Sequence, residues 1–405
     1  MQKSSAFLRQ KEANMLISIA VILLSGLILG KLCKMIRFPS LFGMILAGII
    51  IGPYFLNLID SSILDRSADI RRIALIIILI RAGLKLNLSD LKKVGRPAIL
   101  MCFVPACLEM VGMILLAPLI LNISILDAAI LGAVIGAVSP AVIVPRMINL
   151  IDEGYGNDKG IPQMILAGAS VDDVFVIVMF TTFTGFANGE GVDLLSFINI
   201  PISILTGIVI GGITGYILSL LFEKKKMNLM IRTIVILTIS FLLSALETDY
   251  GKFPFASLIA VMSLGTVIFM RNHDMAKELS GQYDKLWIPA EVFLFVLVGA
   301  SVAVDHAISA GIHVILLVLL VLVFRMLGVF LCLIGTKLSG KERLFCMIAY
   351  TPKATVQAAI GGIPLAMGLS CGQIVLTVSV IAILLTVPLG AFGIDLTYRS
   401  FLKKE

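Results

Sequence analysis

Charged residues are scarce in this chain of 405 residues. Asp, Glu, Lys and Arg together make up 14% of the sequence, whereas 59% of the residues are hydrophobic. Soluble globular domains carry about 25% charged residues, so the composition excludes that class and indicates a membrane protein. The apolar segments are long and uniformly apolar, without the alternation of transmembrane strands. They therefore predict an all-α polytopic fold.

Residue types that build enzyme and metal centres are equally sparse. The three histidines lie at loops or span ends, and the six cysteines lie in or beside apolar spans without metal-ligand spacing. We interpret the cysteines as small packing residues. No phosphate-binding loop, nucleophile with its base or zinc motif occurs, so we expect neither an enzyme nor a cofactor. The residues concerned are His273, His306 and His313, and Cys33, Cys102, Cys107, Cys332, Cys346 and Cys371.

The apolar segments predict thirteen membrane-spanning helices joined by short loops. With the N-terminus outside, the cytoplasmic loops and tail hold 22 of the 32 basic residues, the other side holds 7 and the spans hold 3. This bias predicts an outside N-terminus and a cytoplasmic C-terminus. It also relates the net charge of +7 to membrane orientation rather than to nucleic acid. The absence of a targeting extension favours a prokaryotic inner membrane.

Two adjacent carboxylates, Asp172 and Asp173, interrupt the apolar segment 161–187 at its centre. One carboxylate in the middle of a membrane helix costs at least about 2.5–3.5 kcal/mol, so this pair predicts an ion or proton site. The two side chains point about 100° apart around a helix, so they face different surroundings. The alternative is a structural pair that caps a helix end or binds an arginine.

Two predicted spans contain a proline near their middle, at Pro140 in 125–149 and at Pro352 in 342–368. Proline removes a backbone donor and clashes with the preceding turn. Either span alone is explained by a simple kink. The matching positions favour two broken helices, whose free carbonyl groups line a cavity beside the aspartates. We expect Ser139 and Thr351, which precede the prolines, to lie at these breaks.

Equivalent features recur about 215 residues apart. Ser139-Pro140 corresponds to Thr351-Pro352, and Glu109 in one predicted span corresponds to Arg325 in another. Seven spans separate the equivalent positions, so the two halves have opposite orientations. This predicts two inverted-topology repeats of six helices, the architecture of many secondary transporters.

Three further charges lie within the predicted spans beside the aspartates. Glu109 and Arg325 have opposite signs and are predicted to form a buried ion pair, with separate water-lined positions as the alternative. Lys353 follows the second break, where its charge offsets the carbonyl end of a half-helix. A direct proton-carrying role is the alternative for this lysine.

Small residues recur at a spacing of four in several spans. This spacing allows two helices to approach closely, either within the chain or between two copies of it. The sequence leaves both options open. The sets are Gly43/Ala47, Gly48/Gly52 and Gly207/Gly211/Gly215.

Three segments resemble the monovalent cation:proton antiporter superfamily. The similarity is greatest to the paired-aspartate branch, which includes the animal sodium/hydrogen exchanger-like domain-containing proteins, and it covers essentially the whole membrane region. The third segment is the most specific. The segments are Ala137-Val138-Ser139-Pro140-Ala141, Gly168-Ala169-Ser170-Val171-Asp172-Asp173 and Thr351-Pro352-Lys353-Ala354-Thr355-Val356-Gln357-Ala358-Ala359.

This resemblance implies residue roles. Asp173 would be the principal ion-carrying carboxylate, and Asp172 would lie close to the site and pair with Arg325. Many bacterial relatives have a lysine at the position of Arg325, and an arginine does not release its proton. The family pattern also implies a homodimer. In it, a transporting core at about 96–187 and 310–395 moves against dimerisation helices at about 14–88 and 195–307.

We therefore expect residues 1–405 to form one membrane transporter domain that exchanges Na⁺ or Li⁺ for H⁺ by elevator-type alternating access, serving pH and sodium homeostasis. The alternatives are K⁺/H⁺ exchange, a Na⁺-coupled organic-solute symporter of the same fold and, third, a passive channel. The expected partners are the lipid bilayer, monovalent cations, protons and a second copy, without nucleic acid. The ion-binding residues would be Asp172, Asp173, Ala137, Val138, Ser139 and Ala169, with Glu109, Arg325 and Lys353 balancing the charge.

Overall fold

The computed structural model is built from α-helices. It describes residues 2–36, 38–86, 95–187, 194–225, 227–249, 255–302 and 304–405. Within these ranges no β-strand occurs, and the one strand-like contact is an isolated bridge between Tyr155 and Lys404. The predicted all-α class is confirmed.

Eight helical segments in the described ranges are long and apolar enough to cross a membrane, and three shorter apolar helices accompany them. The prediction of a polytopic membrane protein is confirmed, whereas the exact number of thirteen spans stays a prediction. The first half contains α1 (Gln2–Met35), α2 (Ser40–Ile51), α3 (Ser61–Asp65), α4 (Ser67–Gly83), α6 (Arg96–Met101), α7 (Val104–Leu121), α8 (Ile125–Ile135), α9 (Pro140–Glu153) and α10 (Ile161–Ala187). The second half contains α11 (Leu194–Lys224), α12 (Leu229–Asp249), α13 (Ser257–Arg271), α14 (His273–Ala300), α15 (Val304–Cys332), α16 (Gly340–Ala349), α17 (Thr355–Ile360), α18 (Ile363–Ala366) and α19 (Gly372–Phe401).

Both predicted helix interruptions are present. Four residues separate the end of α8 from Pro140, the first residue of α9. This position tolerates proline because its N–H needs no helical partner. Likewise, α16 ends before Thr351-Pro352 and α17 begins after them. The two interruptions touch, because the Ser139 N–H donates to the Pro352 carbonyl at 2.8 Å.

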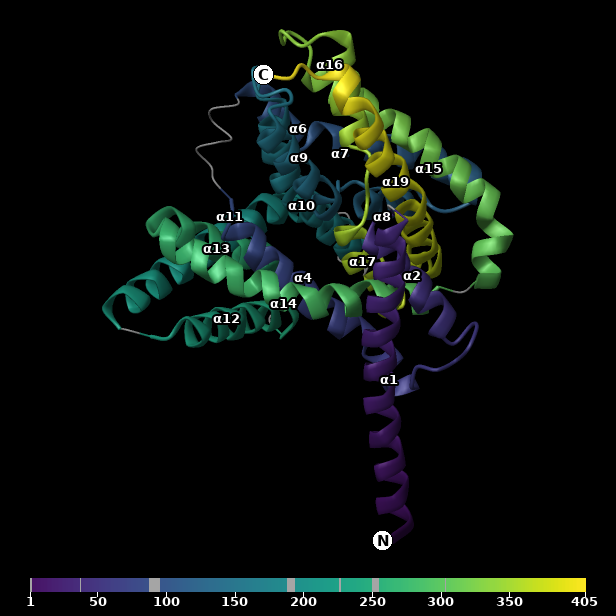
Figure 1. The fold of residues 1–405 in the computed structure, drawn as a ribbon. Helices are drawn as coiled ribbons and strands as arrows, with labels where there is room; N and C mark the ends of the chain where they lie inside the picture. Colours follow the sequence, from purple (N-terminus) through teal and green to yellow (C-terminus); the bar gives the residue numbers. More distant parts are fainter. Residues whose placement is uncertain are drawn as a thin grey trace.

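The helices form two groups by their contacts. α7 packs against α8 and α15, α10 packs against α8 and α9, and α19 packs against α15 and α16, so these helices surround the interruptions. In the other group α2 packs against α1 and α14, α4 packs against α13 and α14, and α11 packs against α13 (Figure 1). α17 contacts both groups.

The small-residue positions face other helices of the same chain. A Cβ atom at Gly215 would lie 3.0 Å from the Leu264 Cα of α13, and one at Gly207 would lie 2.6 Å from the Ala256 carbonyl oxygen. A Cβ atom at Gly48 of α2 would lie 2.8 Å from the Ala300 backbone nitrogen of α14. Of the two options that the sequence left open, the structure uses these positions for packing within the chain.

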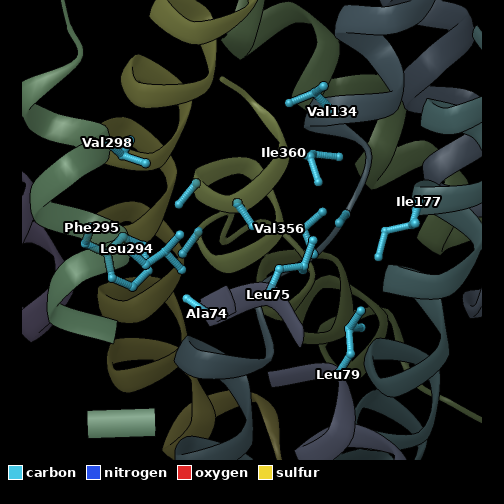
Figure 2. Close-up of a cluster of buried hydrophobic side chains, with 14 of the residues drawn as sticks. Ala74, Leu75, Leu79, Val134, Ile177, Leu294, Phe295, Val298, Val356 and Ile360 are labelled. Carbon is cyan, nitrogen blue, oxygen red and sulfur yellow. The ribbon is translucent and has the colours of Figure 1, made fainter. Parts of the chain in front are cut away.

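The two helix groups meet in a buried apolar cluster. Figure 2 shows side chains of α4 and α14 packed with side chains of α8, α10 and α17. Within a membrane such side chains hold helices together by close van der Waals packing, because lipid tails are as apolar as the side chains. The labelled residues are Ala74, Leu75 and Leu79 of α4, Leu294, Phe295 and Val298 of α14, Val134 of α8, Ile177 of α10, and Val356 and Ile360 of α17.

Candidate ion-binding site

Asp172 lies on α10 and is fully buried. Its Oδ2 accepts a hydrogen bond from the Val138 N–H at 2.8 Å and a charged one from Arg325 Nη2 at 3.0 Å. The local sequence permits this approach, because a Cβ at Gly168, one turn earlier, would lie 2.9 Å from Met101 Cβ and overlap Tyr350 Oη. The Asp172 carboxylate is thus held by the first interruption and by α15.

Each aspartate of the pair keeps one buried oxygen without a hydrogen-bond partner among the described residues, namely Asp172 Oδ1 and Asp173 Oδ1. Leaving a buried acceptor unpaired costs about 1–3 kcal/mol, and more if it carries charge. A bound proton or cation would remove that cost. The two carboxylates therefore differ: Asp172 has two protein donors, whereas no hydrogen bond or ion pair to the Asp173 carboxylate is seen in the described part.

Arg325 lies on α15 and is fully buried. Its Nε donates to the carbonyl of Tyr350, the C-cap residue of α16, at 2.6 Å. Its Nη1 donates to the carbonyl of Gly136, the C-cap residue of α8. The same guanidinium reaches Glu109 Oε2 at 2.7 Å and Asp172 Oδ2 at 3.0 Å. Arg325 thus joins the carbonyl ends of both half-helices to two carboxylates. Because arginine stays protonated, it is a fixed positive charge.

Glu109, on α7, connects this arginine to the second interruption. Lys353 Nζ lies 2.7 Å from Glu109 Oε1 and donates to the Ile135 carbonyl at 2.8 Å. Lys353 is 1% exposed and its backbone N–H donates to Thr386 Oγ1 at 3.0 Å. The lysine therefore lies at the carbonyl end of α8, which belongs to the other interrupted segment.

The formal charges of this cluster nearly cancel. Arg325 and Lys353 are cationic, and Glu109, Asp172 and Asp173 are carboxylates. When all are ionised, one negative charge is in excess. One monovalent cation or one proton neutralises it, and unbalanced charge in a low-dielectric interior is costly.

The remaining predicted residues differ in how close they come to the carboxylates. The Ala137 carbonyl accepts from Gln357 Nε2 at 2.8 Å, and the buried Ser139 Oγ has no partner in the described part of the chain. Ala169 packs in an apolar cluster, and Thr351 Oγ1 donates to the Ile348 carbonyl at 2.8 Å. These two, with Pro140, shape the site and make no polar contact with the carboxylates that the structure describes.

Three residues of the site were not singled out by the sequence analysis, namely Gln357, Tyr350 and Thr386. Gln357 is a lone amide in an apolar helix, and that isolation was a usable signal. Tyr350 acts through its backbone carbonyl and Thr386 through a hydroxyl that also bonds its own helix. Neither of these leaves a sequence signal.

Charged residues away from the interruptions have other partners. Arg81 of α4 pairs with Asp284 of α14, which Lys85 also contacts at 2.9 Å. The His273 ring meets Phe269 edge-on, with ring centroids 4.5 Å apart. The side chain of His306 lies outside the described residues.

Comparison with known proteins places this chain in a family. The family model described as sodium/hydrogen exchanger, transmembrane, matches residues 19–398. Sodium/hydrogen exchanger 9B2 of Mus musculus is 31% identical over 395 residues, which covers 93% of this chain and 72% of that protein. Sodium/hydrogen exchanger 9B1 of Homo sapiens is 34% identical over 401 residues, covering 93% and 76% respectively.

A solved structure has the same fold. The sodium proton antiporter MjNhaP1 from Methanocaldococcus jannaschii aligns with a TM-score of 0.84 at 22% identity, over 96% of this chain and 99% of that chain. The family match spans nearly the whole sequence and includes both interruptions, the aspartate pair and the arginine that joins them. The chain belongs to the sodium/hydrogen exchanger family of membrane-integral cation/proton antiporters.

Proposed function

We propose that this protein exchanges Na⁺ or Li⁺ for H⁺, with both ions competing for the carboxylate of Asp173. The observation that carries the proposal is the buried Asp173 Oδ1, which has no hydrogen-bond partner among the described residues. The carboxylate of the adjacent Asp172 is already held by Arg325 and Val138. Carboxylate and hydroxyl oxygens are the ligands that hard cations prefer. Asp172 is then the neighbour that fixes the geometry, and Asp173 is the group that changes its ligand.

The charge count of the cluster supports an exchange of one cation for one proton. The single excess negative charge is neutralised by either ion alone, so the site is balanced in both loaded states. Binding both ions at once, or neither, would leave a buried net charge. This coupling needs no titration of Arg325 or Lys353.

We also propose a two-part architecture of thirteen spans arranged as two inverted repeats. The helices of the site form the mobile core at about 96–187 and 310–395, and the helices at about 14–88 and 195–307 form the dimerisation part. The apolar cluster between α4 and α14 on one side and α8, α10 and α17 on the other supports an elevator motion (Figure 2), because apolar surfaces slide without breaking hydrogen bonds. The exposed apolar side chains Leu24, Leu27 and Ile28 of α1 support a second copy of the chain or lipid as its neighbour.

The positive-inside bias supports an outside N-terminus and a cytoplasmic C-terminus. The proposal includes no enzyme activity, no cofactor and no nucleic-acid partner. The prokaryotic inner membrane stays a prediction.

The test is proton movement in proteoliposomes that enclose a pH-sensitive dye and receive a pulse of Na⁺, Li⁺ or K⁺. Na⁺ and Li⁺ should each drive protons across the membrane, and Asp173→Asn should abolish that movement while the protein still reconstitutes. Asp158→Asn makes the same chemical change at an exposed loop position and is the matched control.

Each other outcome contradicts the proposal in a recognisable way. Undiminished proton movement in Asp173→Asn would show that the carboxylate of Asp173 does not carry the ions. A response to K⁺ alone identifies K⁺/H⁺ exchange, and transport that requires an organic solute identifies a symporter. Flux that ignores a pH gradient identifies a channel.

A further inference from the structure

Gln357 lies on α17 at the crossing of the two interruptions and is 1% exposed. Its side-chain Nε2 donates to the Ala137 carbonyl at 2.8 Å and to the Ile135 carbonyl at 3.1 Å. These two acceptors fix the orientation of the amide, since its oxygen could not replace the nitrogen there. Gln357 thus connects the second interrupted segment to the carbonyl end of the first.

Three consecutive carbonyls at the end of α8, those of Ile135, Gly136 and Ala137, each accept from a side-chain N–H. The Ile135 carbonyl accepts from Lys353 as well as Gln357, and the Gly136 carbonyl accepts from Arg325. The Ala137 carbonyl is held by Gln357, with no second donor to it among the described residues. These carbonyls were expected to be free beside the aspartates, whereas each of them accepts at least one side-chain hydrogen bond.

Gln357 also orients the peptide unit that serves Asp172. The carbonyl of Ala137 and the N–H of Val138 belong to one planar trans peptide, so holding the oxygen fixes the direction of the N–H. That N–H donates to Asp172 Oδ2 at 2.8 Å. Because the N–H and C=O of a trans peptide point in opposite directions, the Ala137 carbonyl points away from Asp172, and Gln357 holds it there.

We propose that Gln357 is a positioning residue that determines cation selectivity, because it keeps the Ala137 carbonyl out of the ion site. This inference rests on the proposed cation/proton exchange. A site of carboxylate oxygens has a high field strength and favours the small ions Li⁺ and Na⁺. Adding weaker neutral carbonyl dipoles increases the number of ligands and favours the larger K⁺.

The experiment compares Gln357→Met with the parent protein in proteoliposomes. Methionine has a similar length but no donor, so the Ala137–Val138 peptide becomes free to turn its carbonyl towards the ion, while Lys353 still donates to the Ile135 carbonyl. The apparent KM for K⁺ relative to that for Na⁺ should fall by about tenfold, which corresponds to about 1.4 kcal/mol of preference for the larger ion. Gln373→Met, the same change on α19, is the matched control and should keep the parent ratio.

A purely structural role for Gln357 would lower the maximal rate for Na⁺, Li⁺ and K⁺ alike and leave the KM ratio unchanged, and this result would overturn the inference. If Gln357→Met does not fold, Gln357→Leu provides the same test, because it also lacks an N–H donor and adds no charge. The shift of the unfolding temperature by each cation in detergent gives a second readout of selectivity. Failure of the proposed function is distinct, because the parent protein would then move no protons in response to any cation.

Discussion

Two regions of this molecule solve the problem of helix packing in opposite ways. In the polar crossing, formed by residues 136–139 and 350–354 with Glu109, Asp172, Arg325 and Gln357, helices are joined by charged side chains bonded to backbone carbonyls. In the glycine contacts of α11 with α13 and of α2 with α14, missing side chains let two backbones touch directly.

The difference is between interactions that can be exchanged and contacts that cannot. An acceptor oxygen of the polar crossing can exchange its protein donor for a cation or a proton, because each of these presents positive charge to the oxygen. A glycine contact has no alternative partner, since two helix backbones in van der Waals contact offer no group that an ion could replace. The polar crossing is therefore suited to binding, and the glycine contacts are suited to holding a fixed frame.

The largest effect is expected from removal of the central charge of the polar crossing. Arg325→Met should lower the free energy of unfolding by about 3–5 kcal/mol, because Glu109 and Asp172 then remain buried without this partner. Thermal unfolding in detergent measures the loss, and transport should disappear with it. A loss below about 1 kcal/mol would show that water replaces the guanidinium and that the cluster is not dry.

A smaller effect is expected at the second cation of the cluster. Lys353→Met should cost about 1–3 kcal/mol, since Glu109 keeps its bond to Arg325. Lys353→Arg retains the charge and, because arginine does not release its proton, separates charge balance from proton transfer. We expect Na⁺-driven proton movement to persist in Lys353→Arg. Its loss in a variant that unfolds at the parent temperature would assign proton transfer to Lys353.

The glycine contacts should respond to volume rather than to charge. A Cβ atom at Gly211 would lie 2.6 Å from the Ala260 Cα, so Gly211→Ala should cost about 1–3 kcal/mol through overpacking. The adjacent Gly212 is the control, because the nearest described atom to its Cβ would be Val267 Cγ2 at 3.7 Å, an ordinary contact. Unfolding curves should separate the two variants, while KM for Na⁺ stays unchanged in both. Equal stability would contradict the close approach of α11 to α13.

Much of the frame and part of the site followed from the sequence. The interruptions were predictable because proline acts locally, on the turn that precedes it, and the structure has both of them. The aspartate pair stood out because charge is costly in an apolar helix. The small-residue spacings predicted close contacts, but their partners depend on which helices pack together, which no local pattern encodes.

The partners of the broken ends were the part that sequence could not supply. Arg325 and the Gly136 carbonyl are 189 positions apart, and Gln357 and Ala137 are 220 apart. A backbone carbonyl has no residue type, so its donor is set by three-dimensional placement alone. The carbonyls that were expected to be free are hydrogen-bonded for this reason, because the side chains of Arg325, Lys353 and Gln357 reach them.

The smallest effect on stability is expected at an arginine–aspartate ion pair that is exposed to water. Arg146 of α9 and Asp395 of α19 form an ion pair of 3.0 Å, but half of the Asp395 side chain is exposed. An exposed pair contributes only about 0–1 kcal/mol, because solvent screens it and both side chains lose freedom. Asp395→Asn should therefore shift the unfolding temperature little, and added salt should reduce the difference further. Asp172→Asn, the same substitution within the polar crossing, should be strongly destabilising by comparison, since the Arg325 bond then loses its charged acceptor. Equal effects at the two positions would mean that burial does not distinguish the polar crossing from the surface.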